Sequence, residues 1–399
     1  MALESLTRAV TGLKWWVKVL AVFVASRIVT TAIMLSFAAR QGANAWSGPQ
    51  PDYLQFAGFW DAHWYYIIAV SGYPTVLPLN EAGDVAENAW AFMPAYPFLT
   101  RFVVTLTGLD FAVVSVALSV AFAAGAALVF YRVMIRVLPE GSALFAVVLF
   151  CIAPLSPILQ VGYAESMHAF LLALALLLLL RRDYWLLLPV IAVMSLTRPS
   201  GLAFALALLL HVIHRWFTRN SDPFPWRERV ASVVSGLFSA FMGVAWLLIA
   251  WGVTGSFTAY TDTELAWRAD YVGRVELVPF TPWFQSAGFW LGMPGGPFIV
   301  GAAIAFLVAV AALLASPWGR RLGVDLRFWI VSYLLYLLAV FFPQSSTFRL
   351  LVPLFPLLGA IAVPTSRVFR WSVVALCIAG QFGWIHIAWW VDGYDWTPP

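Results

Sequence analysis

The stretch "WWVKVLAVFVASRIVTTAIMLSFAA", Trp15 to Ala39, is long and apolar enough to decide the fold class. A helix needs about 20 residues to cross the roughly 30 Å hydrocarbon core of a bilayer, and this stretch exceeds that length. Ala43-Asn44-Ala45 follows with the small residues of a cleavage site, but the apolar region of a cleavable signal has only about 7 to 15 residues. We therefore interpret the stretch as a retained first membrane helix.

Similar stretches recur along the whole chain of 399 residues, of which 62% are hydrophobic and 11% charged. Ordinary soluble domains have about 25% charged residues. The expected spans are 15–39, 111–131, 141–158, 166–181, 184–197, 200–216, 230–253, 297–315, 327–342, 350–363 and 371–390. The sequence thus predicts one all-α polytopic membrane domain, 1–399, with about 11 transmembrane helices. The spans 184–197 and 350–363 are short, so we expect them to be tilted, broken or extended into their flanks.

The basic residues indicate how the chain is oriented. With a cytoplasmic N-terminus, 16 of the 23 basic residues fall in inner segments, including Arg8, whereas 13 of the 19 acids fall outside and Glu4 falls inside. This bias predicts a plasma-membrane protein with its N-terminus inside and its C-terminus outside. Arginine greatly outnumbers lysine, which is typical of a high-GC bacterium. The two longest outer loops are 40–110 and 254–296, so outer-face chemistry is expected mainly there.

The first outer loop contains "FWDAHWYY", residues 59–66. Phe56, Trp60 and Trp64 recur at helical spacing, and tryptophan is typical of helices at the headgroup level. We therefore expect interfacial helices in this loop, with Asp61 beside the apolar stripe as a candidate base. From spacing alone, the alternative is that Asp61 is a solvated or salt-bridged surface acid on an amphipathic helix.

Five segments along the chain resemble the signature regions of one family. They are "FWDAHWYYIIAVSGY" (59–73), "ENAWAFMPAYPFLTR" (87–101), "GYAES" (162–166), "LTRPSG" (196–201) and "FRLLVPLFPLLG" (348–359). Their order and content resemble the PIG-V type mannosyltransferases, the family of GPI mannosyltransferase II and its bacterial relatives, within the GT-C superfamily. Phe59 and Met93 differ conservatively from the residues that family members often have there.

This resemblance implies a GT-C fold and an inverting glycosyltransferase on the outer face of the membrane. Such an enzyme moves mannose from polyprenyl-phosphate-mannose to a lipid-linked or other extracytoplasmic glycan acceptor. A carboxylate in the first outer loop is the family's usual base, and that role falls on Asp61. One carboxylate suffices, because the leaving phosphate needs no protonation. Glycoside hydrolases instead need two carboxylates.

A leaving phosphate is stabilised by guanidinium groups, whose forked donors match its oxygens. Arg349 and Arg198 each stand at the outer end of an apolar segment, where an arginine is costly without a partner. Arg101 is a third candidate for the donor phosphate. The alternative for all three is a side chain that snorkels to the interface or pairs with a structural acid.

Six residues are candidates for contacts to the sugar or the acceptor. They are Trp60, His63, Glu87, Asn88, Tyr96 and Glu165. The alternative for Glu165 is a helix N-terminal position that suits an acid. Glu87 and Asn88 are otherwise solvated loop residues, and His63 is otherwise an interfacial packing residue. Tyr96 lies in "PAYP", whose two prolines predict a rigid corner that either walls the sugar site or only turns the chain.

No metal, nucleotide or cofactor site is predicted. His211 and His214 lie three apart without a carboxylate motif, and Asp110, Asp262 and Asp270 show no ligand spacing, so a divalent cation requirement stays open. Phosphate-binding glycine loops and nucleic-acid features are absent from the sequence. The expected partners are the lipid-linked donor, the glycan acceptor and membrane lipids.

A transporter or flippase of lipid-linked sugars is the rival function. It would also combine many helices with outer acids and arginines. We would expect it to have charged or broken-helix sites near the bilayer midplane and internal symmetry. The charges gather at the outer ends of the apolar segments instead, which favours the transferase.

Overall fold

The computed structural model describes residues 12–344 and 346–392, and the regular structure in these two ranges is helical. The first half contains α2 (Trp15–Ala38), α3 (Tyr53–Ala57), α4 (Asp61–Ser71), η1 (Ala89–Ala91), α5 (Ala95–Thr107), α6 (Phe111–Met134), α7 (Glu140–Ile152), η2 (Ser156–Gln160), α8 (Glu165–Arg181) and α9 (Tyr184–Ser195). The second half contains α10 (Gly201–Phe217), α11 (Trp226–Thr254), α12 (Ala259–Val272), α13 (Thr281–Leu291), α14 (Gly296–Ala315), α15 (Pro317–Arg320), α16 (Gly323–Val340), α17 (Thr347–Leu350), η3 (Val352–Leu354), α18 (Leu357–Ile361), α19 (Arg367–Trp384) and η4 (Ile385–Trp389). Glu4 and Arg8 lie outside the described residues.

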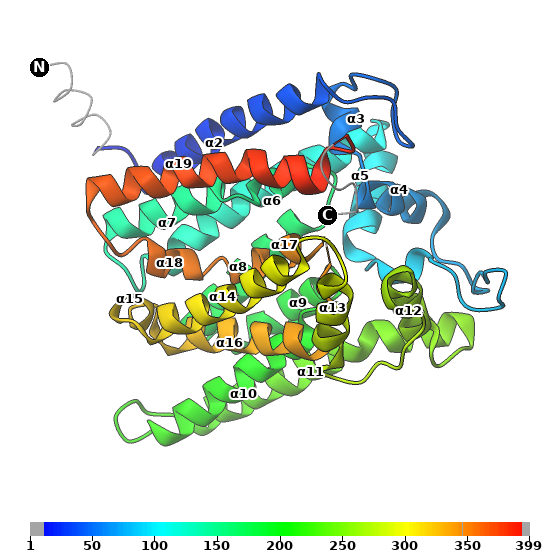
Figure 1. Ribbon diagram of the computed structural model, residues 1–399. Helices are drawn as coiled ribbons and strands as arrows, with labels where there is room; N and C mark the ends of the chain where they lie inside the picture. The colour runs from blue at the N-terminus through cyan, green and yellow to red at the C-terminus, as the bar shows by residue number, and fades with distance from the viewer. Residues whose placement is uncertain (1–11, 345, 393–399) are drawn as a thin grey trace, which may run out of the picture.

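The long helices run side by side, and the short ones collect at the ends of the bundle (Figure 1). The helices α3, α4, α12 and α13 gather at one end, on the right of the view. The beginnings of α2 and α19, together with α15, lie at the opposite end. The two long loops predicted to be outer, 40–110 and 254–296, therefore contribute their helices to the same end of the molecule.

Six of the described helices are long and apolar enough to cross a membrane. They are α2, α6, α11, α14, α16 and α19 with its continuation η4. Three further apolar helices, α7, α9 and α10, are shorter. Nine of the eleven expected segments form one continuous helix each, and 141–158 is divided between α7 and η2. The number of actual membrane crossings stays a prediction. The fold class is the predicted one, an all-α multi-pass membrane protein.

The segment 350–363 is also broken, into three short helices. Pro353 and Pro356 lack the amide hydrogen that a continuous helix requires, so α17, η3 and α18 replace a single helix. The carbonyl oxygens freed by the break are hydrogen-bonded from α16: the indole of Trp329 donates to Pro353 at 2.9 Å, and the hydroxyl of Tyr333 donates to Leu350 at 2.8 Å. The break ends the apolar segment beside Arg349.

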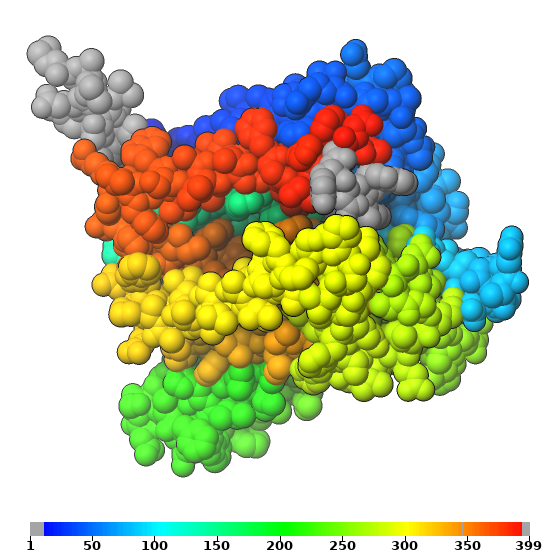
Figure 2. Space-filling view, viewed as in Figure 1, coloured from blue at the N-terminus to red at the C-terminus, as the bar shows by residue number. Residues whose placement is uncertain are grey.

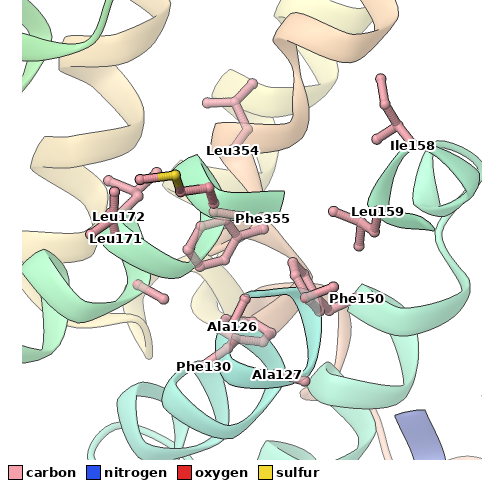
Figure 3. Packing of buried hydrophobic residues seen from close by; sticks show 14 of the residues in the cluster. Ala126, Ala127, Phe130, Phe150, Ile158, Leu159, Leu171, Leu172, Leu354 and Phe355 are labelled. Carbon is pink, nitrogen blue, oxygen red and sulfur yellow. The ribbon is translucent and has the colours of Figure 1, made fainter. Parts of the chain in front are cut away.

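The broken segment is also anchored in the apolar core (Figure 3). The ring of Phe355 packs edge-on against Phe130 and Phe150, with centroid separations of 5.1 and 5.7 Å. A side chain at Gly359 would lie 2.5 Å from the sulfur of Met134, so glycine lets the backbone approach α6 without displacing the Met134 side chain.

The outer surface of the bundle is apolar. Figure 2 shows α14 (yellow) and α19 (red) as separate ridges with a hollow between them. Large apolar side chains of α14 are exposed, including Phe298, Ile304 and Val308. Such a surface suits lipid contact rather than water.

Candidate active site

Asp61 is the first residue of α4 and is held in place by the residue before it. Trp60 has a left-handed backbone, with φ of 59°, a conformation that costs energy for a residue with a side chain. The Trp60 indole donates a hydrogen bond of 3.1 Å to the carbonyl of Trp389. The Trp60 ring packs against the Trp46 ring, with a centroid separation of 4.4 Å. The amide of Asp61 donates to the hydroxyl of Tyr163 at 2.9 Å. These contacts fix where α4 begins and where its carboxylate lies.

Two acid–arginine pairs meet near this point. Arg349 pairs with Asp61, and Arg198 pairs with Glu165, the first residue of α8. The carboxylate side chains are each 5% exposed, and those of Arg349 and Arg198 are 12% and 16% exposed. Burial lowers the pKa of Arg198, but the acidic groups around it, Glu165 first and then others including Asp61, together more than offset this. The pKa is therefore raised, and Arg198 stays a cation.

Both pairs line one cavity of about 790 Å³, a volume in the range of ligand sites. Several buried polar atoms on its wall have no hydrogen-bond partner among the described residues. These atoms are Glu165 Oε2, Ser195 Oγ, Arg198 Nε, Trp267 Nε1, Gln344 Oε1 and Arg349 Nε. Since buried polar groups are normally paired, these unpaired donors and acceptors set the cavity lining apart from an ordinary core.

A further part of the lining comes from the second long loop and from Glu87 and residues 91–93 of the first. The helix α12 contributes Tyr260, Glu264, Trp267, Arg268 and Tyr271. Burial raises the pKa of the Glu264 carboxyl above its usual 4.5. Burial, and secondarily the charge of Asp270, likewise raises the pKa of Glu87.

The structure brings five of the ten predicted site residues to this cavity. They are Asp61, Glu87, Glu165, Arg198 and Arg349. The other five, Trp60, His63, Asn88, Tyr96 and Arg101, do not line it.

Three of those five have other structural contacts. Trp60 packs in the core. Tyr96 is fully buried and its hydroxyl donates to Ser115 at 2.8 Å. Asn88 donates to Thr263 at 2.9 Å and caps the short helix η1. His63 is exposed beside Tyr66, and Arg101 is exposed on α5.

Glu264, Trp267 and Arg268 line the cavity but are not among the site residues predicted from the sequence. A signal was present, because residues 260, 264, 267, 268 and 271 of "AYTDTELAWRADYV" recur at the spacing of one helical face. The segment lies in a loop between two apolar spans, and a polar helix there resembles any solvated connection.

The described residues contain no group of three metal-ligating side chains. Asp270 lines the cavity, whereas Asp110 and Asp262 do not. His211 is buried between the Tyr184 hydroxyl, at 2.9 Å, and Asp325, at 2.7 Å. This contact joins α9, α10 and α16, so His211 has a structural role here.

The fold and composition define a multi-pass helical membrane protein. No family model and no curated protein match the chain. Among solved structures, it is similar to the crystal structure of ArnT from Cupriavidus metallidurans bound to undecaprenyl phosphate, with 16% identity over 89% of this chain and 62% of that chain and a TM-score of 0.49. It is also similar to the Archaeoglobus fulgidus oligosaccharyltransferase tethered with an acceptor peptide, with 12% identity over 92% of this chain and 54% of that one and a TM-score of 0.46. The chain spans less than two thirds of either protein, and similarity at this level assigns no function.

Proposed function

We propose that this chain is a GT-C type membrane glycosyltransferase that transfers a sugar from a lipid-phosphate donor to a glycan acceptor. The observation that carries the proposal is the meeting of two acid–arginine pairs, Asp61–Arg349 and Glu165–Arg198, on one cavity wall. All four residues belong to segments that resemble PIG-V type mannosyltransferases. The resemblance alone supplies mannose as the sugar and polyprenyl-phosphate-mannose as the donor.

In the proposed reaction Asp61 is the general base. An acceptor hydroxyl attacks the anomeric carbon of the donor sugar while its proton passes to the Asp61 carboxylate. The bond between the anomeric carbon and the phosphate oxygen breaks, and the polyprenyl phosphate leaves with the electron pair. One displacement at one carbon inverts the anomeric configuration.

The two arginines have the chemistry to stabilise the leaving phosphate. A guanidinium has five N–H donors, and Arg349 uses one nitrogen for Asp61 while its buried Nε has no partner. Arg198 likewise has an unpaired Nε beside the pair it forms with Glu165. Donors that are fixed before the reaction stabilise developing charge without reorganising. Arg349 would therefore connect the base with the phosphate site.

The orientation completes the proposal. With the N-terminus in the cytoplasm, the end of the bundle that carries α4 and α12 faces outward, and the cavity opens toward extracytoplasmic acceptors. The apolar bundle would leave the polyprenyl chain in the bilayer while its phosphate reaches the arginines. A flippase would need no base, so the role of Asp61 separates the two functions.

The test is an assay of the purified protein with radiolabelled polyprenyl-phosphate-mannose and a series of mannoside acceptors. We expect transfer by the wild-type protein and a loss of about 100- to 10,000-fold in Asp61→Asn, the range for removal of a general base. Asp110→Asn is the matched control, because Asp110 is exposed and lies outside the cavity. Wild-type transfer by a folded Asp61→Asn protein would show that Asp61 is not the base, and lipid movement without transfer would favour the flippase.

A further inference from the structure

The helix α12, Ala259–Val272, has two different faces. The buried face contains Ala259, Thr263 and Ala266. The other face lines the cavity and contains Tyr260, Glu264, Trp267, Arg268 and Tyr271. Their spacing of four, three, one and three residues keeps them on one side of a helix. The polar and aromatic face of α12 is thus turned toward the candidate active site.

This α12 wall differs in charge from the wall that carries Asp61. The Asp61 wall pairs two acids with two arginines. The α12 wall instead has Glu87, Glu264 and Asp270 with one arginine, Arg268. No ion pair within 4 Å joins these three acids to a basic residue in the described part of the chain. Arg268 donates to the carbonyl of Val340 at 2.8 Å, which occupies part of its guanidinium.

Carboxylate oxygens accept hydrogen bonds, so they match ligands that carry hydroxyl groups. An anionic ligand on this wall would face three carboxyl groups and the partly occupied guanidinium of Arg268, an arrangement that repels it. The charge of Arg198 also reaches Glu264, but Arg198 is already paired with Glu165. The α12 wall is therefore suited to a neutral polyol and unsuited to a phosphate.

An aromatic surface and unpaired polar atoms lie beside these acids. The Trp267 ring is held edge-on by Trp64 and Phe92, with centroid separations of 5.6 and 5.8 Å, and its indole nitrogen has no partner. Glu165 and Ser195, which are more than nine-tenths buried and belong to other parts of the same lining, also keep buried oxygens, Oε2 and Oγ, without a hydrogen-bond partner. A fixed aromatic ring with hydrogen-bonding groups around it is a general way to bind the apolar face and the hydroxyls of a sugar.

We propose that the α12 wall is the acceptor subsite and that it binds a neutral, hydroxyl-rich glycan, stacked on Trp267 and hydrogen-bonded to Glu264 and Glu87. The assignment of this glycan as an acceptor rests on the proposed function. The subsite selects against an acceptor whose reacting sugar carries a phosphate or another anionic group. Donor phosphate and acceptor sugar then occupy chemically different walls of one cavity, which keeps each out of the other's position.

The test measures binding without any donor, so that it does not depend on catalysis. Equilibrium dialysis in detergent compares radiolabelled octyl α-mannoside with its 6-phosphate on the full-length protein. We expect the neutral mannoside to bind at least about tenfold more tightly than the phosphate, equivalent to one unfavourable charged contact. The wild-type comparison needs no substitution, so it stands even where a variant fails to fold.

Variants then locate the selectivity. Glu264→Gln should weaken mannoside binding about tenfold, the cost of one hydrogen bond to a charged group, and should lower the neutral-to-phosphate ratio. Glu276→Gln is the matched control, because Glu276 is exposed nearby and does not line the cavity.

Equal binding of the two probes, or an unchanged ratio in a folded Glu264→Gln protein, would overturn the acceptor subsite even if the protein transfers mannose. Selective binding without any transfer would leave the glycan site standing and overturn the proposed function.

Discussion

Arg349 contacts Asp61 from 288 positions away in the sequence. Both side chains are largely buried, so each charge depends on the other for stabilisation. Such a pair contributes little net free energy of folding compared with a well-packed apolar pair. Removing only one partner is costly, because it leaves the other charge buried and unpaired.

This coupling is testable with a double-mutant cycle. Arg349→Met alone should lower the free energy of unfolding by about 3–5 kcal/mol, because the Asp61 carboxylate loses its partner. Adding Asp61→Asn should restore part of that loss while transfer activity stays absent. Unfolding in detergent and the transfer assay together measure both effects. The pair Arg349→Met with Asp110→Asn is the control and should be additive; additivity in the first cycle would contradict the coupling.

Glu264 makes stability depend on pH. Its pKa is raised above 4.5 by burial, so the folded protein keeps a proton that the unfolded chain has already lost. The contribution of Glu264 to the stability of the folded protein is complete below the pKa that Glu264 has in the unfolded chain. It is lost as the pH rises through the higher pKa that Glu264 has in the folded protein. Wild-type protein should therefore lose stability relative to Glu264→Gln as the pH rises upward from 4.5. Unfolding midpoints of both proteins across this pH range measure the trend, and parallel profiles would exclude Glu264 as its source.

The sequence motif correctly predicts that Asp61 is at the cavity but not that His63 lies outside it, and the reason is helical geometry. Asp61 and His63 are neighbours in the motif, but two residues along a helix differ by about 200° in direction. If the first lines the cavity, the second points away, and His63 is indeed exposed. The motif alone does not reveal where α4 begins. That start depends on the contact of Trp60 with Trp389, a residue from the other end of the chain.

At the scale of elements, the contact between α10 and α11 holds the turn that carries Arg198. Gly201 begins α10, and its carbonyl accepts a hydrogen bond of 2.8 Å from Ser239 of α11. A side chain at Gly243 would lie 2.7 Å from the backbone nitrogen of Leu202, so the two helices touch through backbone atoms. Apolar periodicity predicts both helices, but it cannot show which glycine lies at a crossing.

Gly243→Ala should therefore destabilise the protein by about 1–3 kcal/mol, the usual cost of overpacking. It should also reduce transfer, because a shift of α10 displaces the turn that contains Arg198. Gly252→Ala on the same helix is the control, since nothing lies within 4 Å of its added carbon and alanine is the better helix former. Unfolding midpoints and transfer rates measure both. Equal behaviour of the two variants would mean that the crossing does not position the turn.

At the scale of the whole molecule, charged contacts are divided between the two ends of the bundle. Lys18 pairs with Glu140 at 3.1 Å and Arg182 pairs with Asp222, all in segments predicted to be cytoplasmic. Asp61, Glu165, Arg198 and Arg349 come from segments predicted to be outer. The spans could be predicted because hydropathy is a local property of the chain. The meeting of four motifs that are far apart in the sequence could not be predicted in the same way, because it depends on tertiary contacts. The helix break at Pro353 and Pro356 leaves Arg349 beside Asp61. In the sequence, this break appears only as a short apolar segment.

This separation of charged contacts predicts that the end of the bundle with α4 and α12 faces outward. Labelling of single cysteines in intact spheroplasts can test this orientation. Residue 81 is exposed in the loop before η1, and residue 320 is exposed at the end of α15 on the opposite end of the bundle. In a background with Cys377 replaced by alanine, where the remaining Cys151 is fully buried, Glu81→Cys should react with an impermeant maleimide. Arg320→Cys should react only after detergent opens the membrane, and this second labelling confirms that the thiol is reactive. The reverse pattern would place the cavity on the cytoplasmic side, where a donor sugar would have to be presented from within the cell.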